Sequence, residues 1–399
     1  MTEAVIVATA RTPIGRANKG SLTEWRPDDL SAHIIAALLE KVPSLPKEQI
    51  EDVIWGCGQP AGEAGTNVGR VAAILAGVDA PGVTVNRYCS SSLQTIRMAA
   101  HAIKAGEGDV FIAGGVETVS RFRFGAADTG PGNPKFVDAT ARSAERANGG
   151  HGKWAPPAGL PDVYIAMGQT AENVVEAEGV TREEMDEWAA RSQQRAVASQ
   201  ARGFFDREIT PVLGADGSMV TKDDGPRDGT TVEKLATLKP VFRPDGSVTA
   251  GNACPLNDGA AAVVVMSDAR AQQLGIAPLA RIVSSGVSAL NPEIMGLGPI
   301  EASRQALQRA GLSIDDIDLV EINEAFAAQV LPSAKHLGID LDKLNVNGGA
   351  IALGHPFGMT GARIMGTLIN GLQDADKRYG LETMCVGGGQ GMAMIIERL

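Results

Sequence analysis

Two similar series of short apolar runs follow each other along the chain. Each series has two apolar runs, a helix-like segment and a further apolar run that contains paired glycines. The runs cover residues 50–58, 83–89 and 109–117 in the first half, and 317–325, 344–350 and 382–396 in the second. Apolar runs of this length bounded by turn residues are typical of buried strands. The pattern predicts two duplicated α/β units packed together, with chance similarity between α/β segments as the alternative.

The composition changes between the two series. Residues 121–163 are rich in Gly, Pro and Ala and contain several arginines: Arg121, Arg123, Arg142 and Arg146. A helical run follows, in which Thr181 and Glu184 have the spacing of a capping box. Residues 260–268 then form an apolar run that we expect to return to the first unit as a buried strand. We therefore predict a first half of residues 1–120 plus 250–270, an inserted loop domain at 121–249, and a second half at 271–399.

A cysteine stands where an apolar run ends and a helical pattern begins. Cys89 is followed by three serines, which suit a helix N-terminus, and then by apolar residues at helical spacing from Leu93 to Ile103. The positive end of a helix dipole favours a thiolate, so we expect the pKa of the Cys89 thiol to be lowered. The alternative is a small core residue in a strand-to-helix turn.

Three further stretches place polar groups at the loop ends of predicted strands. Asn323 and Glu324 end one strand, His355 lies in the glycine-rich loop before a helix, and Cys385 precedes a run of glycines. α/β folds bind ligands at such loop ends. Each residue also has an ordinary interpretation, as a helix-capping asparagine, a loop histidine or a buried thiol.

Composition and charge narrow the class of protein. The 399 residues are 44% hydrophobic and 21% charged, which supports large buried cores. A net charge of -11 argues against nonspecific nucleic-acid binding, and an anionic ligand would need a local basic patch. The four cysteines form no CxxC pair, so we expect neither a disulfide framework nor a metal site. Widely spaced free cysteines fit a reducing cytoplasm better. We see no secretory signal and expect no membrane span.

Taken in this order and spacing, the four stretches resemble the thiolase family. They are "VNRYCSSSLQ" (85–94), "EINEAF" (321–326), "NGGAIALGHPFGMTGAR" (347–363) and "MCVGGGQGM" (384–392), and the resemblance extends from "ARTPIG" (10–15) to the C-terminus. It implies the thiolase fold, two α/β thiolase halves with an inserted loop domain. It also implies reversible thiolysis of 3-ketoacyl-CoA, or condensation of two acyl-CoA molecules in the other direction.

The resemblance assigns a role to each polar group. Cys89 is expected to carry the acyl group, His355 to take the Cys89 proton, and Cys385 to protonate the leaving carbanion or to create it in condensation. One oxyanion hole is expected from His355 and a water held by Asn323. The backbone N–H groups of Cys89 and Gly387 are expected to form the other.

The expected coenzyme A contacts follow from the same resemblance. They point to Arg227 near the adenine, to apolar side chains along the nucleotide and pantetheine, and to Lys234 nearby; the apolar residues are Leu235, Leu238 and Phe242. Cys254 stands where many members have serine, which weakens one pantetheine hydrogen bond because a thiol donates weakly. Coenzyme A is expected as a substrate rather than a bound cofactor, and the particle as a homodimer or homotetramer. Cys57 has no motif around it and is expected in the core.

Other interpretations remain open from the sequence. A ketoacyl synthase usually pairs its cysteine with two histidines, and a hydroxymethylglutaryl-CoA synthase needs a catalytic glutamate, whereas this chain has Cys385 at the second position. An inactive acyl-CoA carrier would have no reason to keep Cys89, Asn323, His355 and Cys385. A strict acetoacetyl-CoA thiolase is the alternative on substrate range, because short-chain thiolases commonly carry histidine where this chain has Ala166.

Overall fold

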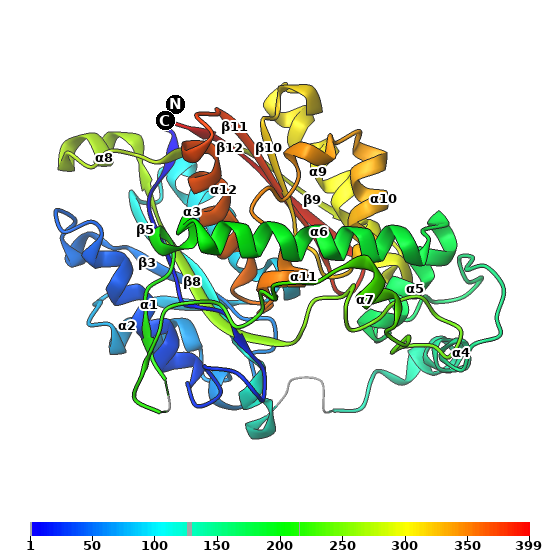
Figure 1. Cartoon of the computed structure of the whole chain (residues 1–399). Coiled ribbons are helices and arrows are strands. Elements are labelled where there is room, and N and C mark those ends of the chain that lie inside the picture. Colours follow the sequence, from blue (N-terminus) through cyan, green and yellow to red (C-terminus); the bar gives the residue numbers. More distant parts are fainter. Residues whose placement is uncertain (1, 126–129, 215) are drawn as a thin grey trace.

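The computed structural model describes residues 2–125, 130–214 and 216–399. Its strands are β1 (Ala4–Arg11), β2 (Gly15–Arg16), β3 (Asp52–Gly56), β4 (Gly82–Val85), β5 (Val110–Thr118), β6 (Val212–Leu213), β7 (Met219–Val220), β8 (Asn257–Ser267), β9 (Ala280–Ala289), β10 (Leu319–Ile322), β11 (Tyr379–Val386) and β12 (Gln390–Arg398). Its α-helices are α1 (Pro27–Glu40), α2 (Val68–Leu75), α3 (Ser91–Ala105), α4 (Val137–Ala147), α5 (Met167–Glu178), α6 (Arg182–Ala201), α7 (Val232–Ala236), α8 (Asp268–Leu274), α9 (Gly298–Ala310), α10 (Ala327–Leu337), α11 (Ala350–Leu353) and α12 (Thr360–Asp374). Figure 1 shows a mixed α/β fold, as predicted.

The sheet contains the duplication seen in the sequence. The strand order is β10-β11-β12-β9-β1-β8-β5-β3-β4, in a ten-stranded sheet that β2 joins by pairing with β8. In the first half β3 runs parallel to β5, which pairs antiparallel with β8. In the second half β10 runs parallel to β11, which pairs antiparallel with β12. The two halves meet where β1 and β9 pair over two residue pairs, Val5 with Arg281 and Ile6 with Ala280.

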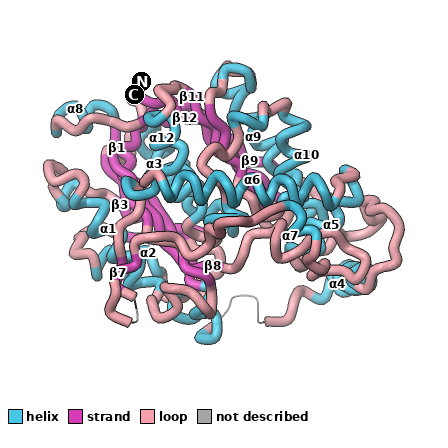
Figure 2. The backbone as a smooth tube through the Cα atoms, in the orientation of Figure 1, coloured by secondary structure: helices cyan, strands magenta, loops and turns pink. Residues whose placement is uncertain are grey.

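Helices α3 and α12 lie between the two halves of the sheet (Figure 2). Both contact β8 and α12 also contacts β11, so their apolar sides share one buried core with strands of both halves. Helices α1 and α2 cover the outer face of the first half, and α9 and α10 that of the second, each over a core of its own. This layering places the first turn of α3 and the loop before α12 side by side.

Two details differ from the predicted elements. The segment predicted as a strand at 344–350 keeps one bridge, between Leu344 and Val320, and continues as turns into α11. Asn345 has a φ of 48°, and its side chain bonds both backbone groups of Ile322 in place of a strand ladder. The helical run after residue 170 is divided into α5 and α6 at Gly179, where φ is 72°.

Other predicted elements are confirmed. The Thr181–Glu184 capping box is present at the start of α6, and the apolar run at 260–268 lies within β8 between β1 and β5. The domain boundaries at residues 120, 249 and 270 stay predictions. Among the described residues, no helix combines the length and apolar character that crossing a bilayer requires.

Candidate active site

Cys89 lies in a single 3-10 turn, Tyr88–Ser90, between β4 and the first residue of α3. The turn is strained, because Tyr88 has a φ of 43°, which costs a bulky residue about 1–3 kcal/mol. Local hydrogen bonds hold it: Tyr88 N–H donates to Asn86 Oδ1 at 2.8 Å, and Arg87 N–H donates to Ser91 Oγ at 2.9 Å. Strain of this kind is typical of functional turns.

Burial dominates the electrostatics of Cys89, contrary to the lowered pKa expected from the helix dipole. The residue is 9% exposed, and burial raises the pKa of its thiol to about 11. The backbone N–H groups of Gly387 and of Cys89 itself hydrogen-bond the sulfur and act in the opposite direction. The desolvation penalty is larger than the effect of these donors, so the resting thiol is protonated at neutral pH.

Three cysteines share one electrostatic neighbourhood. Burial raises the pKa of Cys385 well above its ordinary value, and the nearby Cys89 and Cys254 thiols raise it further. Burial also raises the pKa of Cys254, again with a contribution from Cys89. Cys385 is the penultimate residue of β11 and Cys254 precedes β8, so distant parts of the sequence converge here. All three thiols are neutral at rest.

The glycine turn after Cys385 is tied to the Cys89 turn by a side-chain relay that the sequence reasoning missed. Arg87 donates to Gln94 Oε1 at 3.0 Å and to Gln390 Oε1 at 2.7 Å. Gln390 donates in turn to the Gly387 carbonyl at 3.3 Å. Arg87 therefore fixes the donor N–H of Gly387 relative to Cys89. The sequence signal that could have indicated this relay is an arginine two residues before the candidate nucleophile.

The His355 ring is held in one tautomer. Its Nδ1 lies 2.6 Å from Thr360 Oγ1, and that hydroxyl already donates its proton to the Pro356 carbonyl at 2.8 Å. A hydroxyl has one proton, so we assign the proton of this hydrogen bond to His355 Nδ1. His355 Nε2 then carries a lone pair. Burial, with a smaller contribution from Arg363, lowers the pKa of His355 to about 3, so the ring is a neutral base.

Asn323 occupies the other side of the histidine ring. Its Nδ2 donates to His355 Nε2 at 3.2 Å. Its Oδ1 is buried and accepts no hydrogen bond from the described residues, so this oxygen can hold a water. In the described ranges no hydrogen bond joins the His355 ring to the Cys89 thiol.

Two buried carboxylates position these loops. Glu117 accepts from Gly58 N–H at 2.8 Å and from Gly358 N–H at 2.9 Å, which connects the end of β5 to the His355 loop. Burial raises the pKa of Glu117 to about 7. Glu324 accepts from four donors, which are Trp188 Nε1, Ser192 Oγ, Asn345 Nδ2 and Ile351 N–H. The sequence predicted Glu324 only as part of the Asn323 stretch, and the structure shows it as an anchor that holds neighbouring segments. Cys57 is a core residue, as expected, and its sulfur lies 3.8 Å from Glu117 Oε1.

The residues expected to contact coenzyme A form a continuous segment beside Cys254. Leu235 and Leu238 lie against the backbone of Gly251, close enough that a Cβ there would come within 2.6 Å of Leu238 Cδ1. Phe242 packs edge-on against Phe326, with ring centroids 6.1 Å apart. Lys234 Nζ donates to the Gly229 carbonyl and Arg227 N–H to Gln193 Oε1. The segment is mostly exposed, and Leu235 is its buried apolar residue.

The raised pKa of Cys89 predicts an unusual alkylation profile. We expect the rate of iodoacetamide labelling of Cys89 in the free protein to rise about tenfold per pH unit from pH 7 to 10, because the thiolate is the nucleophile. Labelling is measured by mass spectrometry of the Cys89 peptide, with glutathione in the same buffers as the control. A plateau below pH 8 for Cys89 would contradict the dominance of burial.

Comparisons with known proteins agree along the whole chain. Residues 4–269 match the family model of the thiolase N-terminal domain, and residues 276–398 match that of the thiolase C-terminal domain. Curated relatives include a beta-ketoadipyl-CoA thiolase of Acinetobacter baylyi and a 3-ketoacyl-CoA thiolase of Pseudoalteromonas translucida, each 46% identical over 100% of both chains. A solved acetyl-CoA acetyltransferase of Bacillus anthracis superposes with a TM-score of 0.85 at 39% identity, covering 100% of this chain and 99% of that one.

Proposed function

Because this chain belongs to the thiolase family and is an acyltransferase, we propose that Cys89 is the nucleophile that carries the acyl group during thiolysis of 3-ketoacyl-CoA. The observation that carries the proposal is the pair of backbone donors, from Gly387 and Cys89, directed at the Cys89 sulfur in a site that also holds Cys385. A substrate oxygen beside that sulfur would meet the same two donors.

The first half-reaction begins with neutral partners. The hydrogen bond from Asn323 to His355 Nε2 breaks, Nε2 takes the Cys89 proton, and the sulfur attacks the 3-keto carbon of the substrate. The bond between the second and third acyl carbons then breaks, and its electron pair leaves as an acetyl-CoA enolate. Cys385, whose burial keeps it protonated, donates its proton to that carbon and releases acetyl-CoA.

The second half-reaction restores the site. The thiol of coenzyme A gives its proton to the Cys385 thiolate and attacks the acyl carbonyl. The Cys89 sulfur leaves and recovers its proton from His355. The shortened acyl-CoA and the resting enzyme result, and condensation is the same path reversed. Coenzyme A takes part as a substrate, and no step requires a bound cofactor or metal.

Negative charge develops on two thioester or ketone oxygens, and each has donors nearby. The backbone N–H groups of Cys89 and Gly387 serve the oxygen of the group bound to Cys89. His355 becomes a donor at Nε2 once it holds the Cys89 proton, and it serves the enolate oxygen with a water held by Asn323. A positioned donor of this kind contributes roughly 3–4 kcal/mol to catalysis.

Replacing His355 with alanine tests the base. We expect His355→Ala to slow the single-turnover acylation of Cys89 by about 10³-fold, because a positioned general base is lost. The rate is followed by intact-protein mass spectrometry after mixing with acetyl-CoA. The matched control is His336→Ala: His336 is an exposed residue of α10, and its ring contacts Glu178 rather than the site. Equal acylation rates in His355→Ala and the wild type would remove His355 from this role.

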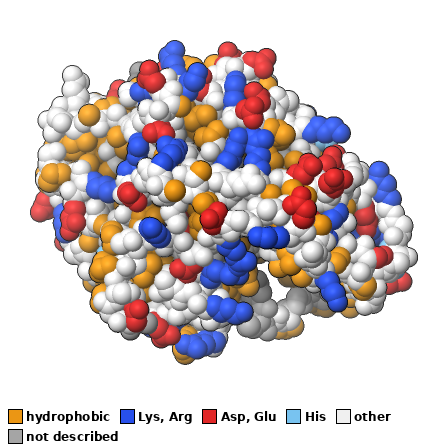
Figure 3. Space-filling view, viewed as in Figure 1, with side chains coloured by type: hydrophobic (Ala, Val, Ile, Leu, Met, Phe, Trp, Pro, Cys, Tyr) orange, Lys and Arg blue, Asp and Glu red, His pale blue; other side chains and the backbone are white. Residues whose placement is uncertain are grey.

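Basic side chains on one face of the molecule support coenzyme A as the ligand. The chain is acidic overall, with a net charge of -11. Even so, Lys and Arg side chains gather near the centre of the face that α6 crosses, below that helix (Figure 3). We propose that Arg227, Lys234, Leu235, Leu238 and Phe242 contact the nucleotide and pantetheine, and that Cys254 lies at the thioester end.

Ala166 bears on the range of acyl chains. It is the exposed N-cap of α5, beside Met167, whose Sδ lies 3.7 Å from where a Cβ on Gly387 would stand. We propose that alanine leaves apolar space for the acyl chain there, and that Met295 and Phe326, both buried, set its limit. We propose a general 3-ketoacyl-CoA thiolase, since each methylene buried in such space contributes about 0.8 kcal/mol.

A substrate series tests this range. We expect kcat/KM to rise a few-fold per added carbon from four- to eight-carbon 3-ketoacyl-CoA, because each added methylene is buried. The Ala166→His variant, which fills the space, should reverse this order. Because one curated relative is named beta-ketoadipyl-CoA thiolase, beta-ketoadipyl-CoA is also included in the series. Activity confined to the four-carbon substrate would show that the chain is a strict acetoacetyl-CoA enzyme.

The outer edge of the first half-sheet supports an oligomer. Strand β4 ends the strand order, and apolar residues of the adjoining α2 are exposed, with Ile74 at 58% and Leu75 at 53%. An unpaired strand edge beside exposed apolar side chains favours association. We propose a cytoplasmic homodimer or homotetramer, which light scattering of the purified protein tests.

A further inference from the structure

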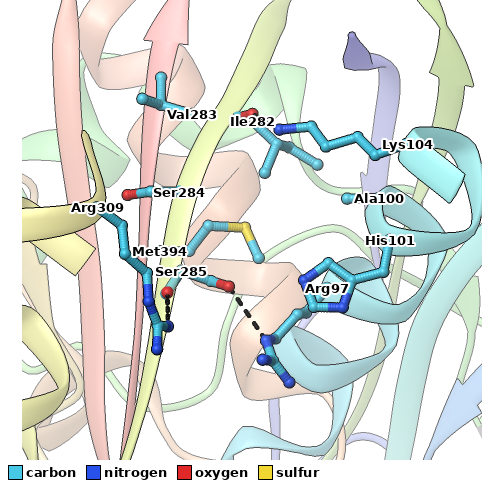
Figure 4. Close-up of a pocket in the computed structure, with 10 residues that line it drawn as sticks. All are labelled: Arg97, Ala100, His101, Lys104, Ile282, Val283, Ser284, Ser285, Arg309 and Met394. Carbon is cyan, nitrogen blue, oxygen red and sulfur yellow. Dashed lines mark hydrogen bonds between the residues drawn. The ribbon is translucent and has the colours of Figure 1, made fainter. Parts of the chain in front are cut away.

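A cavity of about 300 Å³ lies against the second half of α3, whereas Cys89 precedes the first turn of that helix. It forms where β1 and β9 separate after their two residue pairs, so one edge of β9 faces the cavity instead of a strand. Helix α3 lines one wall, β9 another, and the end of α9 contributes Arg309 (Figure 4).

The lining is strongly basic. Arg97, His101 and Lys104 lie four and then three residues apart on α3, which places them on one helix face. Arg309 approaches from the opposite side, with Ser285 between it and Arg97 (Figure 4). None of the described residues that line the cavity is an aspartate or a glutamate.

The charge of this cluster is largely uncompensated. Arg97 donates to Ser285 Oγ at 3.1 Å and Arg309 to the Ser285 carbonyl at 2.5 Å, and within the described ranges neither arginine forms an ion pair. Lys104 Nζ lies 3.9 Å from one carboxylate, that of Glu3. Burial lowers the pKa of Arg97, and the charges of Arg87 and Arg309 lower it further. A cluster of cations in an acidic protein is stabilised when an anion binds among them.

We propose that this cavity binds the phosphate group of a small anionic metabolite. Two guanidinium groups retain unused N–H donors that match the oxygens of a tetrahedral oxyanion. Three fixed positive charges suit a dianion better than a monoanionic carboxylate. A volume of about 300 Å³ is at the lower end of small-molecule sites and exceeds what a free ion needs.

His101 makes the affinity depend on pH. It faces Arg97 and Lys104 on its own helix and Arg309 on α9, and the Glu3 carboxylate lies 3.9 Å from Lys104. The described residues of β9 and β12 that line the cavity carry no titratable group. Burial and these three cations lower the pKa of His101. A bound dianion restores a favourable partner for the imidazolium, so an anion whose own charge does not change takes up a proton on binding and binds more tightly as pH falls.

Calorimetric titration of the full chain with inorganic phosphate and with sulfate at constant ionic strength tests the site. We expect sulfate, which is a dianion at both pH values, to bind several-fold more tightly at pH 6 than at pH 8. We expect phosphate at pH 8 to bind at least about tenfold more weakly to Arg97→Gln/Arg309→Gln, since two charged donors are lost. Arg304→Gln, on the same helix α9 but directed at the His336 carbonyl instead of the cavity, should bind like the wild type. His101→Gln should remove the pH dependence, and thermal melting verifies that each variant is folded.

A second titration, with a sugar monophosphate, distinguishes a phosphate ester from free phosphate as the ligand. Tighter binding of the ester than of inorganic phosphate identifies a phosphorylated metabolite, and equal binding identifies the free ion. Phosphate affinity that is unchanged in the double variant overturns the proposal. If light scattering shows that the double variant also changes the particle mass while keeping phosphate affinity, the cluster is a subunit contact instead.

Discussion

The Cys89→Ser variant is expected to lose thiolysis by at least ~10⁵-fold in kcat, as other covalent acyl-transfer enzymes do without their nucleophile. Serine keeps the size and hydrogen bonds of the side chain but is far less nucleophilic at neutral pH. Loss of 3-ketoacyl-CoA absorbance measures the rate. No acyl adduct should form on the variant, and its binding of coenzyme A should be close to that of the wild type.

Cys57→Ser is the matched control for this substitution. Cys57 is also buried, and serine preserves its contact with Glu117. We expect its kcat to stay within a few-fold of the wild type, because Cys57 has no role in the proposed chemistry. Retention of more than a few per cent of kcat in Cys89→Ser would show that another group carries the acyl chain.

The Cys385→Ala variant is expected to separate the two half-reactions. Without the acid, the enolate cannot be protonated, and overall turnover should fall by about 10⁴-fold, at the upper end of general acid–base effects. Acylation of Cys89 by acetyl-CoA needs no carbanion, so a stable adduct should still form. Intact mass measures the adduct, and steady-state thiolysis measures turnover.

The same variant distinguishes Cys385 from its neighbour Cys254. Both thiols lie near Cys89, Cys385 fully buried and Cys254 partly so, and desolvation raises the pKa of each. Cys385 ends a strand beside the Gly387 donor, whereas Cys254 is proposed to contact pantetheine. Cys254→Ala should therefore raise KM for coenzyme A more than it lowers kcat. A larger loss of kcat in Cys254→Ala than in Cys385→Ala would exchange the two assignments.

The sequence predicted the parts of the site that depend on strand and helix ends. Cys89 before α3, Asn323 after β10, His355 before α12 and Cys385 at the end of β11 follow from hydrophobic periodicity and glycine positions. The duplicated sheet follows from the same pattern. These features depend on local sequence, and the exception is the strand predicted at 344–350, which the structure replaces by one bridge and turns.

The rest depends on contacts between distant residues. The His355 tautomer is set by Thr360 and the Pro356 carbonyl, and the Arg87–Gln390 relay joins positions 303 residues apart. The pKa of Cys89 was expected to be lowered, but burial by both halves raises it to about 11. Local sequence shows which residues precede a helix, but it does not show how deeply the helix start is buried.

The raised pKa values carry a consequence for mechanism. A protonated Cys89, a neutral His355 and a protonated Cys385 hold no charge at rest, so the buried site avoids the desolvation cost of an ion pair. The thiolate forms when the substrate brings its carbonyl to the backbone donors. This arrangement protects the thiols from oxidation and alkylation between turnovers, because the thiolate is the reactive form.

Peptide mapping of the wild-type protein after brief incubation with acetyl-CoA tests the central claim most directly. The account predicts one acetyl group, on the peptide that contains Cys89, which disappears when coenzyme A is added. Acetylation of Cys385 or Cys254 with Cys89 unlabelled would contradict it.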